Sequence, residues 1–321
     1  MKALVTGGAG LVGSSIIPRL LARGADVLCV DNLTLGTRKH LEEFSSHPAF
    51  RFEEWDVSAR DWHKKLGGGA RFDLCVHLAA NSDISLGHRH PEMDHQRTLA
   101  TTFETLMAAR ELKIPNFIFA STSAVYGANP AFPTPENAGD MHPVSLYGAG
   151  KLASEAFISS FVENYGISAW VFRFGNVVGR RLTHGVIYDF TARLRKDPAE
   201  LVVLGNGGQT KTYVDVEDLT SGILHGFEKS PAGRTHAERF QVLNLSTEGT
   251  TSVREIAEET VKVVTGGKAK IRYGTEQTGW VGDVRKTSLE VSRIQKLGWK
   301  PAHDSTGSVF KAIRDYNEWS R

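Results

Sequence analysis

Two side chains on one predicted helix could together move a proton. Tyr147 and Lys151 are four residues apart in a helical pattern that runs from about Ser145 to Tyr165, so both lie on one face of that helix. A phenol has an ordinary pKa of about 10, and a nearby ammonium would lower that pKa by stabilising the phenolate. Thr122, at the end of an apolar run, could hydrogen-bond the same substrate oxygen. The three side chains predict proton transfer at a substrate hydroxyl, although the Tyr–Lys spacing alone is also typical of a solvated surface pair.

A glycine-rich stretch near the start of the chain predicts a dinucleotide site. The apolar run 3–6 leads into Gly-Gly-Ala-Gly-Leu-Val-Gly, and a helical pattern follows over 14–23. A strand that enters a glycine turn and then a helix points unpaired N–H groups and the positive end of the helix dipole at one spot. Gly7 and Gly10 permit a tight turn and a close ligand, and Gly13 lets the helix lie close to the strand. Such a spot suits a pyrophosphate.

An acidic residue at the end of the next predicted strand bears on the choice of cofactor. Asp31 follows the apolar run 27–30, where a carboxylate can accept hydrogen bonds from a ribose diol and repels a 2′-phosphate. We therefore expect NAD rather than NADP, while Arg38 and Lys39 lie close enough in sequence to leave NADP open. The positive charge of an oxidised nicotinamide would further stabilise a phenolate at Tyr147, which could take a hydroxyl proton as hydride leaves the carbon.

Apolar strand-like runs alternate with helical patterns through the first half of the chain. Further strands are predicted at 50–56, 72–78, 116–120 and 168–174, and helices at 93–112 and 145–165. This alternation is typical of a parallel sheet covered by helices. From about Asn176 the elements become shorter and more mixed, and a last amphipathic helix is predicted at 310–319. The predicted fold class is α/β: a Rossmann-type doubly wound parallel sheet with a smaller mixed α/β C-terminal lobe.

Composition narrows the class of protein. The 321 residues are 40% hydrophobic and 23% charged, with a formal net charge of +2, which is ordinary for a globular protein and favours neither nucleic acid nor a membrane as partner. No apolar run approaches a membrane span, and glycine interrupts the first residues too early for a signal peptide, so we expect a cytoplasmic protein. Cys29 and Cys75 lie in strand-like runs and are expected to be buried, reduced thiols.

Short motifs spread over nearly the whole chain carry a resemblance to a known family. They are GGAGLVG at 7–13, VDNL at 30–33, WDV at 55–57, HLAA at 77–80, STSAVYG at 121–127, YGAGK at 147–151, FRFGNVVG at 172–179, GNGGQTKTYVDVEDL at 205–219 and GWVGDV at 279–284. On these motifs the chain resembles the extended short-chain dehydrogenase/reductases, specifically the NAD-dependent nucleotide-sugar epimerases and dehydratases, closest to the UDP-galactose 4-epimerase branch. The resemblance implies an NAD-binding Rossmann domain over 1–177, with a returning segment at about 213–243. A nucleotide-sugar-binding lobe would occupy 178–212 and 244–321.

The resemblance also implies a mechanism. Tyr147 would take the proton of the sugar C4 hydroxyl while hydride passes from C4 to NAD, and the 4-keto sugar would turn and receive the hydride on its other face. Lys151 would bridge the nicotinamide ribose hydroxyls and tune Tyr147, and Thr122 would complete the catalytic set. The implied cofactor-binding residues are Gly7, Gly10, Leu11, Val12, Gly13, Asp31, Asn32, Leu33, Asp56, Val57, Leu78, Ala79, Ala80, Tyr147, Lys151 and Phe174.

The implied substrate is a nucleotide sugar, UDP-linked by the same resemblance. The implied substrate-binding residues are Thr122, Ser123, Ala124, Tyr147, Asn176, His184, Gly185, Val186, Lys211, Tyr213 and Asp283. Arg180 and Arg181 fall in the loop that holds the nucleobase in the family, but they are equally typical of a solvated pair. Thr278 stands where the family has an arginine for the diphosphate, which Arg285 or Lys286 could replace. Thr98 stands where the family has an asparagine near the cofactor.

Ala124 favours one reaction among those of the family. The 4,6-dehydratases carry Asp and Glu at the positions of Ser123 and Ala124, and the sugar-nucleotide decarboxylases carry Glu at the second. Since alanine cannot move a proton, the hypothesis is an NAD-dependent 4-epimerase of a UDP-hexose. The alternatives are a UDP-uronate epimerase, reductase, decarboxylase or dehydratase of the same group, and a non-catalytic dinucleotide-binding protein.

Two further expectations concern assembly and metals. By analogy with the family, the helices at 93–112 and 145–165 would pair across a homodimer. His88, His90 and His95 lie beside Asp94 in a spacing that some metal sites share. We interpret these histidines as solvent-exposed side chains and expect no metal.

Overall fold

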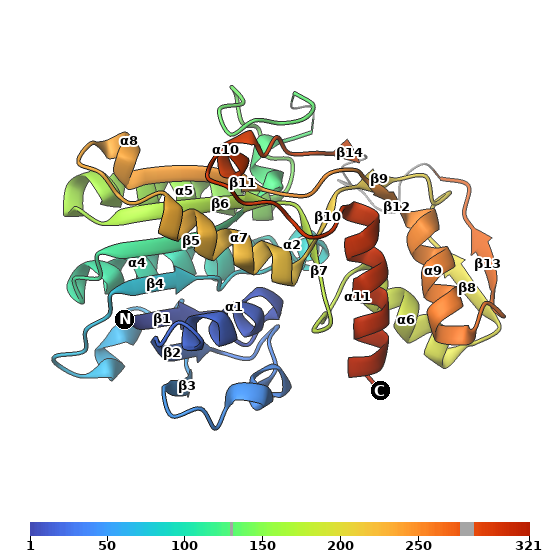
Figure 1. The fold of residues 1–321 in the computed structure, drawn as a ribbon, viewed down its shortest axis with the longest axis horizontal. Helices are drawn as coiled ribbons and strands as arrows, with labels where there is room; N and C mark the ends of the chain where they lie inside the picture. Colours follow the sequence, from blue (N-terminus) through green and yellow to red (C-terminus); the bar gives the residue numbers. More distant parts are fainter. Residues whose placement is uncertain (129–130, 277–285) are drawn as a thin grey trace.

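A single parallel sheet of seven strands organises the protein. The structure is a computed structural model that describes residues 1–128, 131–276 and 286–321. The strands follow the order β11-β6-β5-β4-β1-β2-β3 (Figure 1), and every neighbouring pair is parallel. Their bounds are β1 Lys2–Thr6, β2 Asp26–Asp31, β3 Phe50–Glu54, β4 Leu74–His77, β5 Asn116–Thr122, β6 Ser168–Phe174 and β11 Phe240–Leu245. The order reverses direction at β1, which is the arrangement of a doubly wound Rossmann-type sheet. The predicted fold class is confirmed.

Helices cover both faces of this sheet because its strands are apolar on both sides. Along β1, Ala3 and Val5 pack with α1 (Leu11–Leu21) and α7 (Val216–Lys229), whereas Leu4 packs on the opposite face with α4 (Thr101–Glu111) and α5 (Leu146–Tyr165). Side chains alternate between the faces of a strand, so a strand buried on both faces reads as a continuous apolar run. Figure 1 shows α1 and α7 together on one side of the sheet.

A smaller lobe lies beside the sheet and has a hydrophobic core of its own. Helices α6 (Val186–Lys196), α9 (Val253–Thr265) and α11 (Ser305–Trp319) pack together there with β8 (Glu200–Val203) and β13 (Lys270–Tyr273), which pair in parallel. Figure 1 shows this group to the right of the sheet. Three short pairings complete the lobe: β7 (Asn176–Val178) with β10 (Tyr213–Asp215), and β9 (Thr210–Lys211) with both β12 (Thr251–Ser252) and β14 (Lys286–Thr287). The chain crosses between lobe and sheet several times, and the predicted domain boundaries stay a prediction.

The helix predicted at 93–112 is interrupted. It consists of α3 (Pro91–Asp94), a six-residue π-helix (His95–Ala100) and α4. Threonine hydroxyls bond backbone carbonyls here, as when Thr101 and Thr102 both donate to the Thr98 carbonyl. Such side-chain bonds compete with the regular helical ladder, and apolar periodicity does not reveal them. The remaining short helices are Arg38–Phe44, Trp62–Leu66, α2 (Ile84–Arg89), Ser123–Tyr126, α8 (His236–Arg239) and α10 (Ser292–Lys296).

Two expectations from composition meet the structure directly. Cys29 and Cys75 are both buried and both free, as predicted. Within the described part of the chain, none of the helices combines the length and the apolar character that crossing a bilayer requires.

Candidate active site

A large cavity opens at the carboxyl ends of the sheet strands, between the sheet and the smaller lobe. Its volume is about 1170 Å³, which is large enough for a dinucleotide and a second ligand together. Open α/β sheets bind ligands at this edge, where the strand order reverses. Of the residues predicted for the site, those that line the cavity are Gly7, Gly10, Leu11, Val12, Gly13, Asp31, Asn32, Asp56, Val57, Leu78, Ala79, Ala80, Thr122, Ser123, Ala124, Tyr147, Phe174, Asn176, His184, Gly185, Val186, Lys211 and Tyr213.

Three predicted residues stand apart from that set. Leu33 packs on the hydrophobic core beside the sheet instead of lining the cavity. Lys151 is 1% exposed and lies beneath the cavity surface. Asp283 lies outside the described residues, as do Thr278, Arg285 and the motif at 279–284. Lys286 begins β14.

The glycine loop is packed tightly against its own backbone. Gly7 has φ +72°, a conformation that side chains disfavour, and a Cβ there would lie 2.5 Å from the backbone nitrogen of Ala79. A Cβ on Gly13 would lie 2.5 Å from the Gly7 carbonyl oxygen. Because neither glycine has a Cβ, the start of α1 can lie directly against the end of β1. The first N–H groups of α1 therefore face the cavity, where they can bind a pyrophosphate.

Asp31 is held by the same loop. Its Oδ2 accepts a hydrogen bond from the Ala9 N–H at 3.0 Å, and its Oδ1 accepts one from the Leu33 N–H at 2.8 Å. Burial raises the pKa of Asp31, while these two N–H donors oppose the rise. Leu33 thus serves the site through its backbone, which explains why its side chain is elsewhere. The carboxylate lines the cavity at the position where a ribose diol can donate to it.

Arg38 and Lys39, the two cations that could have favoured NADP, contact other residues. Arg38 pairs with Glu54 at 2.6 Å and lies over the Phe52 ring. Lys39 lies 4.3 Å from the centre of the Trp319 ring. Neither Arg38 nor Lys39 lines the cavity. A 2′-phosphate beside Asp31 would therefore be repelled by the carboxylate, and neither of these two cations would neutralise it.

Tyr147 and Thr122 both line the cavity, and their side chains share a hydrogen bond. Thr122 ends β5, and its Oγ1 accepts a hydrogen bond from the Ala124 N–H at 3.2 Å. Tyr147 lies in the first turn of α5, which begins because Ser145 caps it by accepting a hydrogen bond from the Gly148 N–H at 3.1 Å. A hydrogen bond with Thr122 lowers the pKa of Tyr147, but burial and the nearby Asp94 carboxyl raise it, and the net shift is upward.

Lys151 is bound differently from the expectation. Its Nζ donates to the Ala120 carbonyl at 2.6 Å and lies 4.6 Å from the centre of the Phe119 ring. Burial lowers the pKa of Lys151 to about 7, although Glu155 opposes the shift. At neutral pH the amine is therefore only partly charged. Because burial disfavours the ammonium, the lowering of the Tyr147 pKa by Lys151 stays a prediction.

The substrate end of the cavity brings together residues from the lobe and the sheet. Asn176 lines the cavity and donates from Nδ2 to the Thr212 carbonyl at 3.1 Å. His184 and Gly185 precede α6, and Lys211 lies on β9. Arg180 and Arg181 do not line the cavity. Both pair with Glu43, at 2.6 and 2.8 Å, and Arg181 is 3% exposed.

Four charged residues of the cavity were missed by the sequence analysis. They are Asp83, Arg97, Asp189 and Arg193. Arg97 lies close enough to Asp56 to lower its pKa. Asp189 and Arg193 are four apart in α6, the one signal in the sequence that could have drawn attention to them. Arg193 donates to the Val202 carbonyl at 2.9 Å and offers a cation at the lobe side of the cavity.

A buried polar network supports the wall of the cavity and was also missed. Arg173 pairs with Glu155 at 2.5 Å, with side chains 4% and 5% exposed, and donates to the Tyr126 hydroxyl at 3.1 Å and the Glu136 carbonyl at 3.0 Å. The Tyr126 hydroxyl in turn donates to Asn244 Oδ1 at 2.7 Å.

Asn244, on β11, carries this network to the loop that follows Tyr126. Its Nδ2 donates to the carbonyls of Thr134 and Glu290, each at 3.0 Å, and its N–H donates to Glu136 Oε1 at 2.9 Å. Tyr126 and Thr134 both line the cavity. The wall is thus tied to β6, α5 and β11, and it cannot shift without breaking buried bonds.

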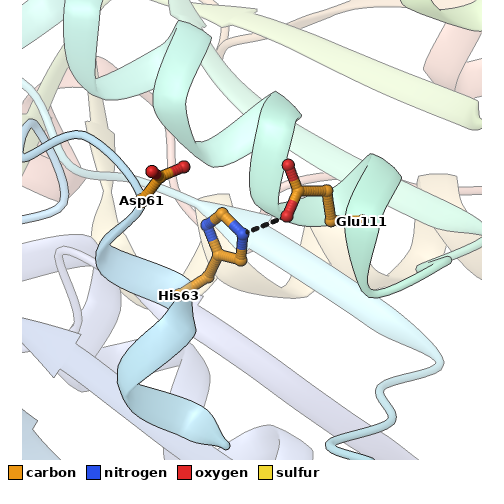
Figure 2. A group of neighbouring side chains, drawn as sticks. All are labelled: Asp61, His63 and Glu111. Carbon is orange, nitrogen blue, oxygen red and sulfur yellow. Dashed lines mark hydrogen bonds and ion pairs between the residues drawn. The ribbon is translucent and has the colours of Figure 1, made fainter. Parts of the chain in front are cut away.

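Among the described residues, one group brings three metal-binding side chain types within reach of each other. Figure 2 shows Asp61, His63 and Glu111, whose ligand atoms lie within 4.8 Å of one another. Glu111 is the last residue of α4, whereas Thr101, at the other end of that helix, lines the cavity. His63 Nε2 lies 2.8 Å from Glu111, and Lys64 pairs with Asp61 at 2.9 Å. Since each carboxylate already has a nitrogen partner, we interpret the group as a polar cluster held by these contacts. His88, His90 and His95 are exposed, as expected.

Comparisons with known proteins agree with this geometry. Residues 3–242 match the sequence profile of the NAD dependent epimerase/dehydratase family. The UDP-glucose 4-epimerase of Mycolicibacterium smegmatis is 29% identical over 329 residues, which cover 100% of both chains. The human dTDP-D-glucose 4,6-dehydratase is 25% identical, over 99% of this chain and 90% of its own. UDP-glucuronic acid decarboxylase 1 of Arabidopsis thaliana is 28% identical, over 98% and 70%.

Solved structures show the same fold over the whole length. The crystal structure of a UDP-galactose 4-epimerase superposes with a TM-score of 0.86 at 33% identity, covering 99% of both chains. The UDP-glucose 4-epimerase of Thermotoga maritima with UDP-glucose gives a TM-score of 0.86 at 28% identity over 100% of both chains. That of Thermus thermophilus in complex with NAD gives 0.83 at 26% identity over 99% of both.

Proposed function

Because the chain belongs to the NAD dependent epimerase/dehydratase family, we propose that it inverts C4 of a UDP-hexose through a transient 4-keto sugar. NAD is its cofactor. The glycine loop would hold the pyrophosphate and Asp31 the adenosine ribose, in agreement with their placement along one side of the cavity. The lobe side, with Asn176, Lys211 and Arg193, would hold the nucleoside diphosphate of the substrate.

The observation that carries this proposal is the pairing of Tyr147 and Thr122 beside Ala124. All three line the cavity, and the tyrosine and threonine hydroxyls interact. The two hydroxyls can bind one sugar oxygen, and Tyr147 can take and return its proton. Elimination of water needs a further acid and base beside the sugar, and the side chain of Ala124 offers neither. Epimerisation at C4 needs only the one exchangeable proton.

The residues divide the work as follows. Tyr147 exchanges the proton of the C4 hydroxyl, and Thr122 orients that oxygen. A bound NAD supplies reversible acceptance of hydride from C4. Burial raises the pKa of Tyr147, and the positive charge that an oxidised nicotinamide would supply lowers the pKa of a nearby phenol. Lys151 would bind the nicotinamide ribose after leaving the Ala120 carbonyl, which lies at the end of the same strand as Thr122.

The experiment incubates the purified protein, without added NAD, with UDP-glucose, UDP-galactose, their N-acetyl forms and UDP-glucuronate. We expect one pair of C4 epimers to reach the same ratio from either side. Tyr147→Phe should lower that rate by about 10²- to 10⁴-fold, the usual contribution of general acid–base catalysis. The proposal would be contradicted if none of these nucleotide sugars were converted to its C4 epimer, or if Tyr147→Phe reacted at the wild-type rate.

A second candidate is another reaction of the same family. The decarboxylase and dehydratase relatives cover nearly the whole chain at 25 to 28% identity, and Lys211 offers a point charge without the planar fork of an arginine. Loss of carbon dioxide or water from a nucleotide sugar, followed by mass spectrometry, or consumption of added NADH, would single out this candidate. A UDP-uronate epimerase would be recognised in the first experiment, because it would convert UDP-glucuronate to its C4 epimer.

We also propose that the protein is a homodimer through α4 and α5. Phe103 of α4 meets Phe157 of α5 with ring centres 5.3 Å apart. Phe157 and Tyr165, both on α5, are nevertheless 41% and 49% exposed, and exposed aromatic side chains along one helix favour a protein contact. Light scattering after size-exclusion chromatography should give twice the chain mass, and Phe157→Glu should give a monomer. A monomeric wild type would contradict this.

A further inference from the structure

A carboxyl group that the mechanism does not use is buried close to Tyr147. Asp94 ends α3 and is 2% exposed. Its Oδ1 accepts a hydrogen bond from Asn81 Nδ2 at 3.0 Å and lies 3.5 Å from the Thr98 hydroxyl, which can also donate to it. Across the described ranges, no lysine, arginine or histidine nitrogen is paired with Asp94. An ionised carboxylate that is buried without a cation is strongly disfavoured.

The other oxygen of this carboxyl group indicates its protonation state. Among the residues that the structure describes, Asp94 Oδ2 has no hydrogen-bond partner, and neither has the buried Oδ1 of Asn81. A carboxylic acid and an amide form a cyclic pair when the amide N–H donates to one acid oxygen and the acid O–H donates to the amide oxygen. The first half of that pair is present at 3.0 Å. A proton on Asp94 Oδ2 would supply the donor that the second half requires.

The backbone of α2 lies close to Asp94 Oδ2. A Cβ on Gly87 would lie 1.8 Å from Asp94 Oδ2, so α2 packs its backbone directly onto the carboxyl group. Burial raises the pKa of Asp94, and the charge of Asp83 raises it further, while Asn81 and Thr98 oppose the rise. In the described part of the chain, the titratable groups near enough to interact electrostatically with Asp94 are Asp83, before α2, and Tyr147, on α5.

The pair connects two parts of the site. Asn81 follows Ala79 and Ala80, which line the cavity, and its Nδ2 also donates to the Asp83 carbonyl at 3.2 Å. On the other side, a Cβ on Gly150, one turn after Tyr147, would lie 3.4 Å from the Asp94 carbonyl oxygen and 3.2 Å from the Thr98 methyl group. Asp94 thus bridges the loop after β4 and the first turns of α5.

We propose that Asp94 is a neutral carboxylic acid paired with the Asn81 amide, and that this pair is a positioning element for Tyr147. It sets the loop after β4 against α5. Because the acid is neutral, it also lacks the charge through which an ionised Asp94 would raise the pKa of Tyr147. This role rests on the proposed function, whereas the protonation state does not. Thr98, at a position where the family has asparagine, forms part of the same group: its Oγ1 accepts from the Asn81 N–H at 3.2 Å.

The protonation state is tested first, by infrared spectroscopy of the wild type at neutral pH. We expect a carbonyl band of a protonated carboxylic acid that disappears in Asp94→Asn and persists in Glu92→Gln. Glu92 is the matched control, since it is an exposed carboxyl group on the same short helix. Absence of the band in the wild type overturns the proposal, whether or not the protein is an epimerase and whether or not the variant folds.

The pH dependence of stability gives a second measure that needs no activity. A carboxyl group with a raised folded pKa stabilises the protein below its unfolded pKa of about 4, and this contribution is lost as pH rises through the folded pKa. The Tm of the wild type should therefore fall relative to that of Asp94→Asn as pH rises above about 4. A constant difference between the two would count against a neutral Asp94.

The positioning role is tested by turnover. Asp94→Ala should lower kcat at least about tenfold, equivalent to 1.4 kcal/mol of barrier, with little change in KM. Asp94→Asn keeps the amide contact and stays neutral, so it should restore most of that loss and extend activity to higher pH. If Asp94→Asn is as impaired as Asp94→Ala, the ionised carboxylate is required and the proposal is wrong.

Discussion

Replacing Gly13 with alanine tests whether the glycine loop is limited by its own backbone. The added methyl group would lie 2.5 Å from both the Gly7 carbonyl oxygen and the Gly8 Cα, and 2.7 Å from the Gly8 carbonyl oxygen. All three are backbone atoms, so no side chain can turn away, and the loop must separate from α1. Overpacking of this kind costs about 1–3 kcal/mol. We expect a value near the upper end, because the contact spans three atoms at once.

Gly10 provides the matched control. Its φ is −79°, which alanine accepts, and a Cβ there would meet only the Gly7 carbonyl oxygen, at 3.4 Å. Gly10→Ala should therefore change the free energy of unfolding by less than about 1 kcal/mol, the usual range for glycine-to-alanine changes at compatible positions. Gly10 lines the cavity, so its methyl group would occupy space that the pyrophosphate needs.

The assay separates the two effects. Nucleotide-free protein is unfolded in urea at 25 °C, and NAD binding is measured by calorimetry. Gly13→Ala should lose about 2–3 kcal/mol of stability and also bind NAD poorly, since the loop N–H groups have moved. Gly10→Ala should keep its stability but bind NAD at least about tenfold more weakly, a loss of 1.4 kcal/mol. A Gly13→Ala variant as stable as the wild type would refute the reasoning, and so would normal NAD binding by Gly10→Ala.

Three further predictions follow from buried charges. The pKa of Lys151 is lowered to about 7 in the folded protein, so above that pH the unfolded chain binds more protons than the folded one. The free energy of unfolding of the wild type should therefore rise between pH 7 and 9, by about 1.4 kcal/mol per pH unit at most. Lys151→Met should lack this rise in urea titrations at the two pH values. Arg173→Met leaves the carboxylate of Glu155 buried without its cation and should lower the free energy of unfolding by about 3–5 kcal/mol. Adding Glu155→Leu should recover most of this loss. If the double variant is no more stable, the unpaired carboxylate is not the cause of the loss. Asp31→Ser removes the charge that repels a 2′-phosphate and should bring the Kd values for NAD and NADP closer together in parallel calorimetric titrations; an unchanged ratio would contradict the role given to Asp31.

Local patterns in the sequence predicted the first six strands of the sheet but not β11. The strand predicted at 168–174 is β6 with the same bounds, and Asp31 ends β2 as expected. These elements are predictable because a buried parallel strand must be apolar on both faces. The glycine loop was predictable for the same reason. The spacing of its glycines indicates where the backbone turns tightly and packs against itself, and this depends on neighbouring residues only.

The parts that could not be predicted depend on contacts between distant segments. Arg180 and Arg181 lie in the loop expected for the nucleobase, but Glu43, more than a hundred residues earlier, binds both. Lys151 has the expected spacing from Tyr147, yet its burial makes the Ala120 carbonyl its partner and lowers its pKa. A spacing indicates which residues share a helix face, but it says nothing of what covers that face.

The network around Asn244 has a consequence for the order in which the protein is built. Chains emerge from the ribosome N-terminus first, and early segments can begin to fold before later ones exist. The glycine loop and β1 to β5 can assemble from the first 122 residues. The cavity wall at Tyr126 and Thr134 depends on hydrogen bonds to Asn244, which is synthesised more than a hundred residues later. Until that residue emerges, a nascent chain can form its nucleotide cradle while the compartment for the sugar stays open.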